Sequence, residues 1–131
     1  LCPKRELEWI DGWNYEMIYS ISGFAEPECT FKTNFPPEGE AYWSMTKCLP
    51  PTEAEYVRFV AGLAIIRLHI KLTALASGSQ AVWEWTYTGI NEQGNDFIAK
   101  HATEQASRSA MRMEMALNHF FQTGEKLKNP M

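Results

Sequence analysis

Residues 64–90 have the sequence AIIRLHIKLTALASGSQAVWEWTYTGI, which predicts two long β-strands joined by a tight turn. Successive side chains of a strand point to opposite faces, and here one face is apolar while the other is mostly polar. The apolar face carries Ala64, Ile66, Leu68, Ile70, Leu72 and Ala74, and the other face carries Ile65, Arg67, His69, Lys71, Thr73 and Leu75. This pattern is typical of a strand with one face buried.

The turn determines the register of this hairpin. Ser77 and Gly78 are expected to form a two-residue turn, because glycine tolerates a positive φ. The pairs that follow are Leu72 with Trp83, Ile70 with Trp85, Leu68 with Tyr87, and Lys71 with Glu84. The register predicts three aromatic residues on the apolar face and an opposite-charge pair on the polar face. Such a wide aromatic surface needs a covering element.

Composition excludes several classes of protein. A length of 131 residues fits one domain, residues 1–131, with residues 126–131 as a loose tail. A formal charge of −4 argues against a nucleic-acid partner. The longest apolar runs fall far short of the roughly 20 residues that span a bilayer, so we expect no integral membrane association and a cytoplasmic protein. The three cysteines lack metal-ligand spacing, and we expect reduced thiols, no metal and no cofactor.

The chain before the hairpin predicts a short helix and an antiparallel meander. Proline in the first turn favours a helix over residues 3–10 that ends near Gly12. Alternating patterns predict strands over residues 15–22, 29–35, 41–47 and 55–61, separated by glycine and proline turns. No crossover helix separates these strands, so neighbouring strands are expected to be antiparallel.

After a polar loop that includes Asn91 and Gly94, the pattern predicts a long helix capped by Thr103 and ending at about Gly124. Its apolar stripe comprises Ala106, Ala110, Met113, Leu117, Phe120 and Phe121, and its polar side comprises Glu104, Arg108, Arg112 and Gln122. This helix is the expected cover of the sheet. Small residues near its start are compatible with a cavity there, and equally with close helix-to-sheet packing.

The order of elements resembles the helix-grip fold of the START-like, birch-allergen-like (SRPBCC) superfamily, which includes polyketide cyclases and lipid carriers. The resemblance rests on LCPKRELEWIDGW at the start, VWEWTYTGI followed by NEQGNDF, and ALNHFFQTGEKL at the end. It implies an α+β domain in which a curved antiparallel sheet wraps around the long C-terminal helix. The family normally begins with a strand that runs into the first helix, and this chain starts at Leu1 inside that region; either a leading strand was removed or disordered, or this member lacks it.

Two groups of polar residues are candidates for a functional site. Arg67, His69 and Lys71 can bind an anion if their face is the inner one, but the hairpin register predicts a solvated outer face. His101 and His119 have no second ligand at metal-binding spacing, and no nucleophile or phosphate-loop motif occurs.

The preferred hypothesis is a carrier that binds a hydrophobic or amphipathic small molecule between the sheet and the C-terminal helix. The alternatives are a cyclase or aromatase-like enzyme and a protein-interaction domain with a filled core; a homodimer is left open. Arg58 can pair with a ligand acid if it is turned inward. The candidate cavity residues are Tyr19, Trp43, Met45, Arg58, Phe59, Leu68, Ile70, Trp85, Tyr87, Ser109, Met113 and Leu117. Catalytic residues are unknown; in the cyclase alternative, Tyr19, Tyr87 or Arg58 polarises a carbonyl of the substrate.

Overall fold

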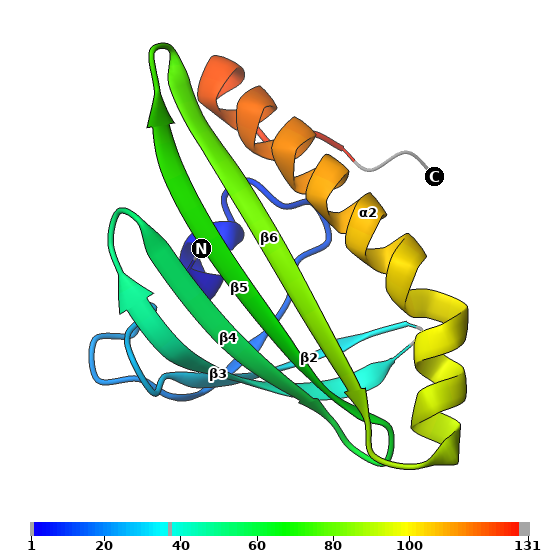
Figure 1. Cartoon of the computed structure of the whole chain (residues 1–131). Coiled ribbons are helices and arrows are strands. Elements are labelled where there is room, and N and C mark those ends of the chain that lie inside the picture. The colour runs from blue at the N-terminus through cyan, green and yellow to red at the C-terminus, as the bar shows by residue number, and fades with distance from the viewer. Residues whose placement is uncertain (1, 37, 129–131) are drawn as a thin grey trace.

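A computed structural model describes residues 2–36 and 38–128, and it contains the predicted hairpin. Strands β5 (Ala64–Leu75) and β6 (Gly78–Gly89) pair antiparallel along their whole length. The long helix α2 (Glu92–Thr123) follows and runs along β6 on the concave side of the sheet (Figure 1). The expected α+β class is confirmed.

The other strands complete the antiparallel meander that the sequence predicts. They are β1 (Glu16–Tyr19), β2 (Thr30–Phe35), β3 (Gly39–Leu49) and β4 (Glu53–Val60). The spatial order of the six strands is their order in the chain, so each strand pairs with its neighbours in sequence. The sheet is strongly curved, and its concave face looks toward α2 (Figure 1).

The register of the hairpin differs from the prediction. Ala76 and Ser77 form the turn, and Gly78 adopts its positive φ of 144° at the first position of β6. Trp85 therefore pairs with Leu68 and not with Ile70. The other pairs shift in the same way, and they include Ile70 with Trp83, Ile66 with Tyr87, Lys71 with Val82, and His69 with Glu84. The shift is two residues, and because strand faces alternate with a period of two, every side chain keeps its predicted face.

The concave face of the sheet carries two clusters of buried residues. One cluster contains Cys29, Phe31, Met45 and Tyr56, and the other contains Ala41, Val60, Ala64 and Ile66. Both come from strands β2 to β5 and the residue before β2, so the curved sheet builds most of its core without the helix. None of the helices in the described part of the chain has the length and apolar composition needed to cross a membrane.

The long helix begins eleven residues before its predicted cap. Asn91, not Thr103, is the N-cap, and its Oδ1 accepts a hydrogen bond of 2.7 Å from the Gly94 N–H. The Asn91 side chain also donates to the Gly62 carbonyl at 2.9 Å. Gly94 packs so closely on the turn before β5 that a Cβ there would lie 1.8 Å from the Leu63 carbonyl oxygen. The predicted polar loop is thus the first turn of α2, whereas the predicted end at Gly124 is confirmed.

A residue after α1 contacts a residue that follows α2. Helix α1 (Pro3–Glu6) is shorter than predicted, and turns follow it to Ile10. Ile10 forms an isolated parallel bridge with Leu127, which belongs to the predicted tail. Residues 129–131 of that tail, with Leu1 and Pro37, lie outside the described residues. The segment after α1 is therefore placed between the concave face and the end of α2.

Candidate functional site: a cavity between the sheet and the long helix

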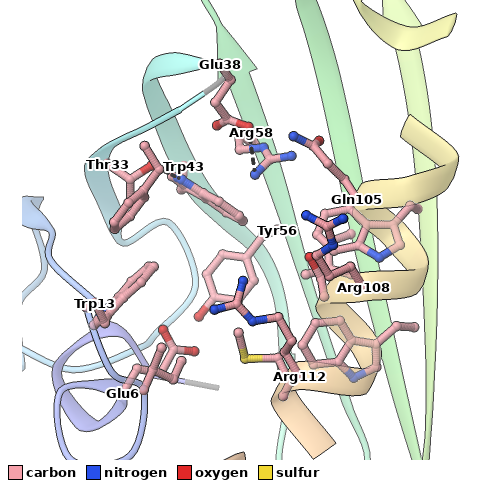
Figure 2. A pocket seen from close by; sticks show the side chains of 18 of the residues that line it. Glu6, Trp13, Thr33, Glu38, Trp43, Tyr56, Arg58, Gln105, Arg108 and Arg112 are labelled. Carbon is pink, nitrogen blue, oxygen red and sulfur yellow. Dashed lines mark hydrogen bonds and ion pairs between the residues drawn. The ribbon is translucent and has the colours of Figure 1, made fainter. Parts of the chain in front are cut away.

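A cavity of about 670 Å³ lies between the concave face of the sheet and α2. Its walls come from strands β2 to β6, from residues 3–13 and from the middle of α2. Ligand pockets in proteins commonly have volumes of roughly 300–1,000 Å³. The space is therefore large enough for a small organic molecule. Figure 2 shows that the side chains lining it include both aromatic rings and charged groups.

Stacked aromatic rings form the sheet side of the cavity. The Trp43 ring stacks on Phe31, with ring centroids 5.6 Å apart, and Tyr56 meets the Trp43 ring edge-on at 6.1 Å. On β6, the rings of Trp85 and Tyr87 stack at 6.2 Å. Such rings present flat apolar surfaces on which an aliphatic or aromatic body can pack.

Arg58 projects from β4 into this aromatic wall. Its Cζ lies 4.7 Å from the Trp43 ring centroid and 5.5 Å from that of Trp85, within cation–π range. Its Nη1 is 3.3 Å from a carboxylate oxygen of Glu38, and the two side chains are only 12% and 8% exposed. Burial lowers the pKa of Arg58, and burial raises the pKa of Glu38 despite the attraction of Arg58. The sheet thus holds a buried ion pair that faces the cavity.

A second buried acid lines the cavity from α1. Glu6 is 8% exposed, and burial raises its pKa to about 7. Burial, and then the charge of Glu6, also raises the pKa of the Tyr56 hydroxyl, which therefore stays protonated at neutral pH. A carboxyl group that titrates near neutral pH can donate or accept a proton under ordinary conditions.

The side of α2 that faces the cavity is more polar than predicted. Arg108 and Arg112, which were expected on the opposite side of the helix, line the cavity and point into it (Figure 2). Arg108 Nη2 pairs with Glu104, whereas Arg112 has no ion-pair or hydrogen-bond partner within the described part of the chain. Phe121, predicted to belong to the apolar stripe, is instead 73% exposed. Because the helix spans a cavity at its middle, long polar side chains are accommodated on its inner face.

Two buried hydrogen-bond donors of this cavity lack an acceptor. Arg58 Nε and Trp85 Nε1 have no hydrogen-bond partner in residues 2–36 and 38–128. Leaving a buried donor unpaired costs about 1–3 kcal/mol, so such atoms commonly mark a place where another molecule supplies the acceptor.

The structure brings many of the predicted site residues together around this space. Those that line the cavity are Trp43, Arg58, Leu68, Trp85, Tyr87, Ser109 and Met113. Met45 and Ile70 have the predicted inward direction but are buried, at 2% and 5% exposure, and Leu117 is half-buried on α2; none of these three lines the cavity.

Tyr19 and Phe59 lie outside the cavity for identifiable reasons. The pairing of β1 with β2 shifts between Met17 and Tyr19, so Tyr19 lies opposite Thr30 on the outer face and is 51% exposed. In β4 the inward set is Tyr56, Arg58 and Val60, which leaves Phe59 on the outer face at 42% exposure. Both strand faces of β4 carry apolar residues, so alternation alone did not identify the inner one.

The basic residues of the hairpin lie outside the cavity, as the register predicts. The His69 side chain hydrogen-bonds Glu53, and Arg67 lies 3.8 Å from Glu55 and 3.9 Å from Glu84. Lys71 is exposed on the same strand face. Pairing with acidic neighbours across the strands accounts for His69 and Arg67 without a ligand.

Sequence reasoning missed the acids of the site and the direction of the helix arginines. Glu6, Glu38, Arg108 and Arg112 are charged residues in segments that resemble solvated surface, and no local pattern distinguishes them. The inward direction of Arg58 was open, because it depends on the face of β4. Tyr56 could have been found from that same strand face.

Comparisons with protein-family models, curated proteins and solved structures found no match to this chain. The geometry of the cavity is therefore the basis for a functional proposal.

Proposed function

We propose that this protein binds an amphipathic small molecule in the cavity between the sheet and α2. The observation that carries this proposal is the cavity itself, which has a volume of about 670 Å³ and a wall that contains two groups of packed aromatic rings. An apolar body that covers Trp43 and Trp85 removes their exposed surface from water, which contributes roughly 25 cal/mol per Å² of apolar area.

The unpaired donors favour a ligand that is amphipathic and not purely apolar. Arg58 Nε and Trp85 Nε1 belong to side chains that line the cavity. A ligand oxygen that accepts from either atom offsets the cost of leaving a donor unpaired. A pure hydrocarbon has no such oxygen.

The fold supports this proposal in general terms. A six-stranded antiparallel sheet followed by a long C-terminal helix is the arrangement expected of a helix-grip domain. We infer that the chain is a START-like domain of the lipid-carrier type. Fold alone does not establish an activity, so the proposal depends on the cavity.

A pair of matched tryptophan variants tests ligand binding. Ala116 lines the cavity, whereas Ala110 is exposed on the same helix, so Ala116→Trp fills the space and Ala110→Trp does not. The probes are dodecanol and naphthol, tested by thermal unfolding, and small molecules retained through purification, tested by native mass spectrometry. A probe at 100 times its Kd stabilises the folded state by about 2.7 kcal/mol.

We expect the wild type and Ala110→Trp to be stabilised, and Ala116→Trp to lose the effect. Far-UV circular dichroism of each variant without probe establishes that it is folded. Equal stabilisation of both variants would place binding elsewhere, and no stabilisation of the wild type by any probe would contradict the proposal.

A cyclase-like activity is the second candidate, because Glu6 faces the cavity with a pKa of about 7. A carboxyl with this pKa can remove a proton from an acidic methylene of a polyketide chain, while a phenol such as Tyr56 donates to the carbonyl oxygen that is attacked. The test is cyclisation of a synthetic poly-β-keto thioester. We expect Glu6→Gln to slow ring closure by 100-fold or more, and an unchanged rate would exclude this role.

The third interpretation, a protein-interaction domain with a filled core, required an interior without a cavity. The cavity beneath α2 does not favour it.

A further inference from the structure

The two walls of the cavity differ in chemistry. The sheet wall consists largely of aromatic rings, with Arg58 held among them by Glu38. The α2 wall carries Gln105, Arg108 and Arg112 (Figure 2). Arg112 is solvent-exposed and lines the cavity, so it lies at the rim of this space. A ligand that fills the cavity can therefore place an apolar body on the sheet and a polar group at the helix.

Most of the charged side chains that line the cavity have an ion-pair partner. Their ion pairs join Glu38 with Arg58, Glu104 with Arg108, and Asp11 with Lys128. Glu6 is kept protonated up to about pH 7 by its burial, so it contributes at most a partial charge at neutral pH. Arg112 has no acidic partner among the residues that the structure describes. Among the arginines of the described lining residues, Arg112 is thus the one without an ion pair.

The buried hydrogen-bonding groups without a partner in the described residues are all donors. The buried side-chain atoms without a partner in the described residues, Arg58 Nε and Trp85 Nε1, are both donors. Arg112 adds further donors and no acceptor. A ligand that complements this cavity therefore supplies acceptors and one negative charge, and it has no need of a donor.

We infer that the ligand is a monocarboxylate with an apolar body, and that Arg112 binds its carboxylate at the rim while the body packs on the aromatic wall. This inference rests on the proposed function, whose ligand class it specifies. The planar guanidinium matches a carboxylate in a bidentate arrangement. A dianionic phosphate fits less well, because Arg112 is the one arginine without an ion pair among the described lining residues.

The experiment compares four probes that share one alkyl chain: dodecanoic acid, dodecanol, dodecylamine and dodecyl phosphate. Isothermal titration calorimetry at neutral pH gives the Kd of each for the wild type, Arg112→Gln and Arg112→Lys. The matched control is Arg67→Gln, which removes the same charge from the outer face of the sheet. Circular dichroism and urea unfolding establish that every variant is folded.

We expect dodecanoic acid to bind the wild type and Arg67→Gln more tightly than the other three probes. A hydrogen bond to a charged group contributes about 1.5–3 kcal/mol, so Arg112→Gln should weaken binding of the acid about 10- to 100-fold. The same variant should weaken binding of dodecanol much less, because an alcohol carries no negative charge, and Arg112→Lys should restore part of the affinity for the acid.

The other outcomes separate two kinds of failure. Dodecanol that binds as tightly as the acid, or an Arg112→Gln variant that binds the acid normally, overturns the inference while the cavity remains a binding site. Preference for dodecylamine or dodecyl phosphate also overturns it, in favour of a cationic or a phosphorylated ligand. Failure of all four probes to bind the wild type contradicts the proposed function as well.

Discussion

Replacing Glu6 by glutamine should change how the stability of this protein depends on pH. Glu6 is 8% exposed, and burial raises its pKa from 4.5 to about 7. Below pH 4.5 the carboxyl is protonated in both the folded and the unfolded chain, so it adds no pH dependence. Between these two pKa values the unfolded chain releases the proton and the folded chain retains it, so stability falls as pH rises. Above about pH 7 the group is ionised in both states, and the loss stays constant.

The magnitude follows from the difference between the two pKa values. The difference, about 7 minus 4.5, multiplied by 1.36 kcal/mol per pKa unit gives a loss of about 3 kcal/mol between acidic and alkaline pH. A domain of this size is typically stable by about 5–15 kcal/mol, so the effect is a large fraction of the total. Glutamine is nearly isosteric with glutamate and does not ionise, so Glu6→Gln should not incur this loss.

Urea unfolding followed by tryptophan fluorescence, repeated from pH 4.5 to pH 8.5, measures the effect. The free energy of unfolding of the wild type, relative to Glu6→Gln, should fall by about 3 kcal/mol across this range. Glu114→Gln is the control, because it removes the same charge from an exposed position on α2 and should follow the wild type. A constant difference between the wild type and Glu6→Gln at all pH values would refute the reasoning.

Three further predictions concern stability and are measured by urea unfolding. Arg58→Met should cost about 3–5 kcal/mol because it leaves Glu38 buried without its cation, and adding Glu38→Gln to this variant should recover most of the loss; an equally unstable double variant would contradict this. Gly94→Ala should cost about 1–3 kcal/mol because its Cβ would lie 1.8 Å from the Leu63 carbonyl oxygen, and a stabilised variant would show that this close contact is unimportant. Asn91→Ala should cost about 1 kcal/mol, because it removes both the cap acceptor for Gly94 N–H and the donor to the Gly62 carbonyl; an Asn91→Ala variant as stable as the wild type would contradict this.

The hairpin shows what alternation can and cannot predict. The faces of Leu68, Ile70 and Trp85 follow from the period of two and were correct. The register was wrong by two residues because Gly78 uses its positive φ just after the turn, and the prediction placed it within the turn. A shift of an even number of residues changes cross-strand partners but leaves each side chain on the same face of the sheet. The prediction that the aromatic residues of β6 lie on the inner face is therefore correct although the predicted register is wrong.

The remaining errors arise where tertiary contacts override local patterns. The first turn of α2 contains glycine and asparagine, which favour loops, but Gly94 is required there for the close contact with Leu63. The bulge before Tyr19 and the inner face of β4 depend on pairing with neighbouring strands. The inward direction of Arg112 depends on the space beneath the helix, which no local sequence pattern encodes.

The contacts at the two ends of α2 have a mechanical consequence. The helix has 32 residues and is therefore about 48 Å long. One end is fixed by Asn91 and Gly94 on the turn before β5, and just beyond the other end Leu127 pairs with Ile10. The helix is thus held by contacts at or near both of its ends, and the cavity lies beneath its middle. The span keeps the aromatic wall accessible, so a ligand does not have to force the site open before it binds.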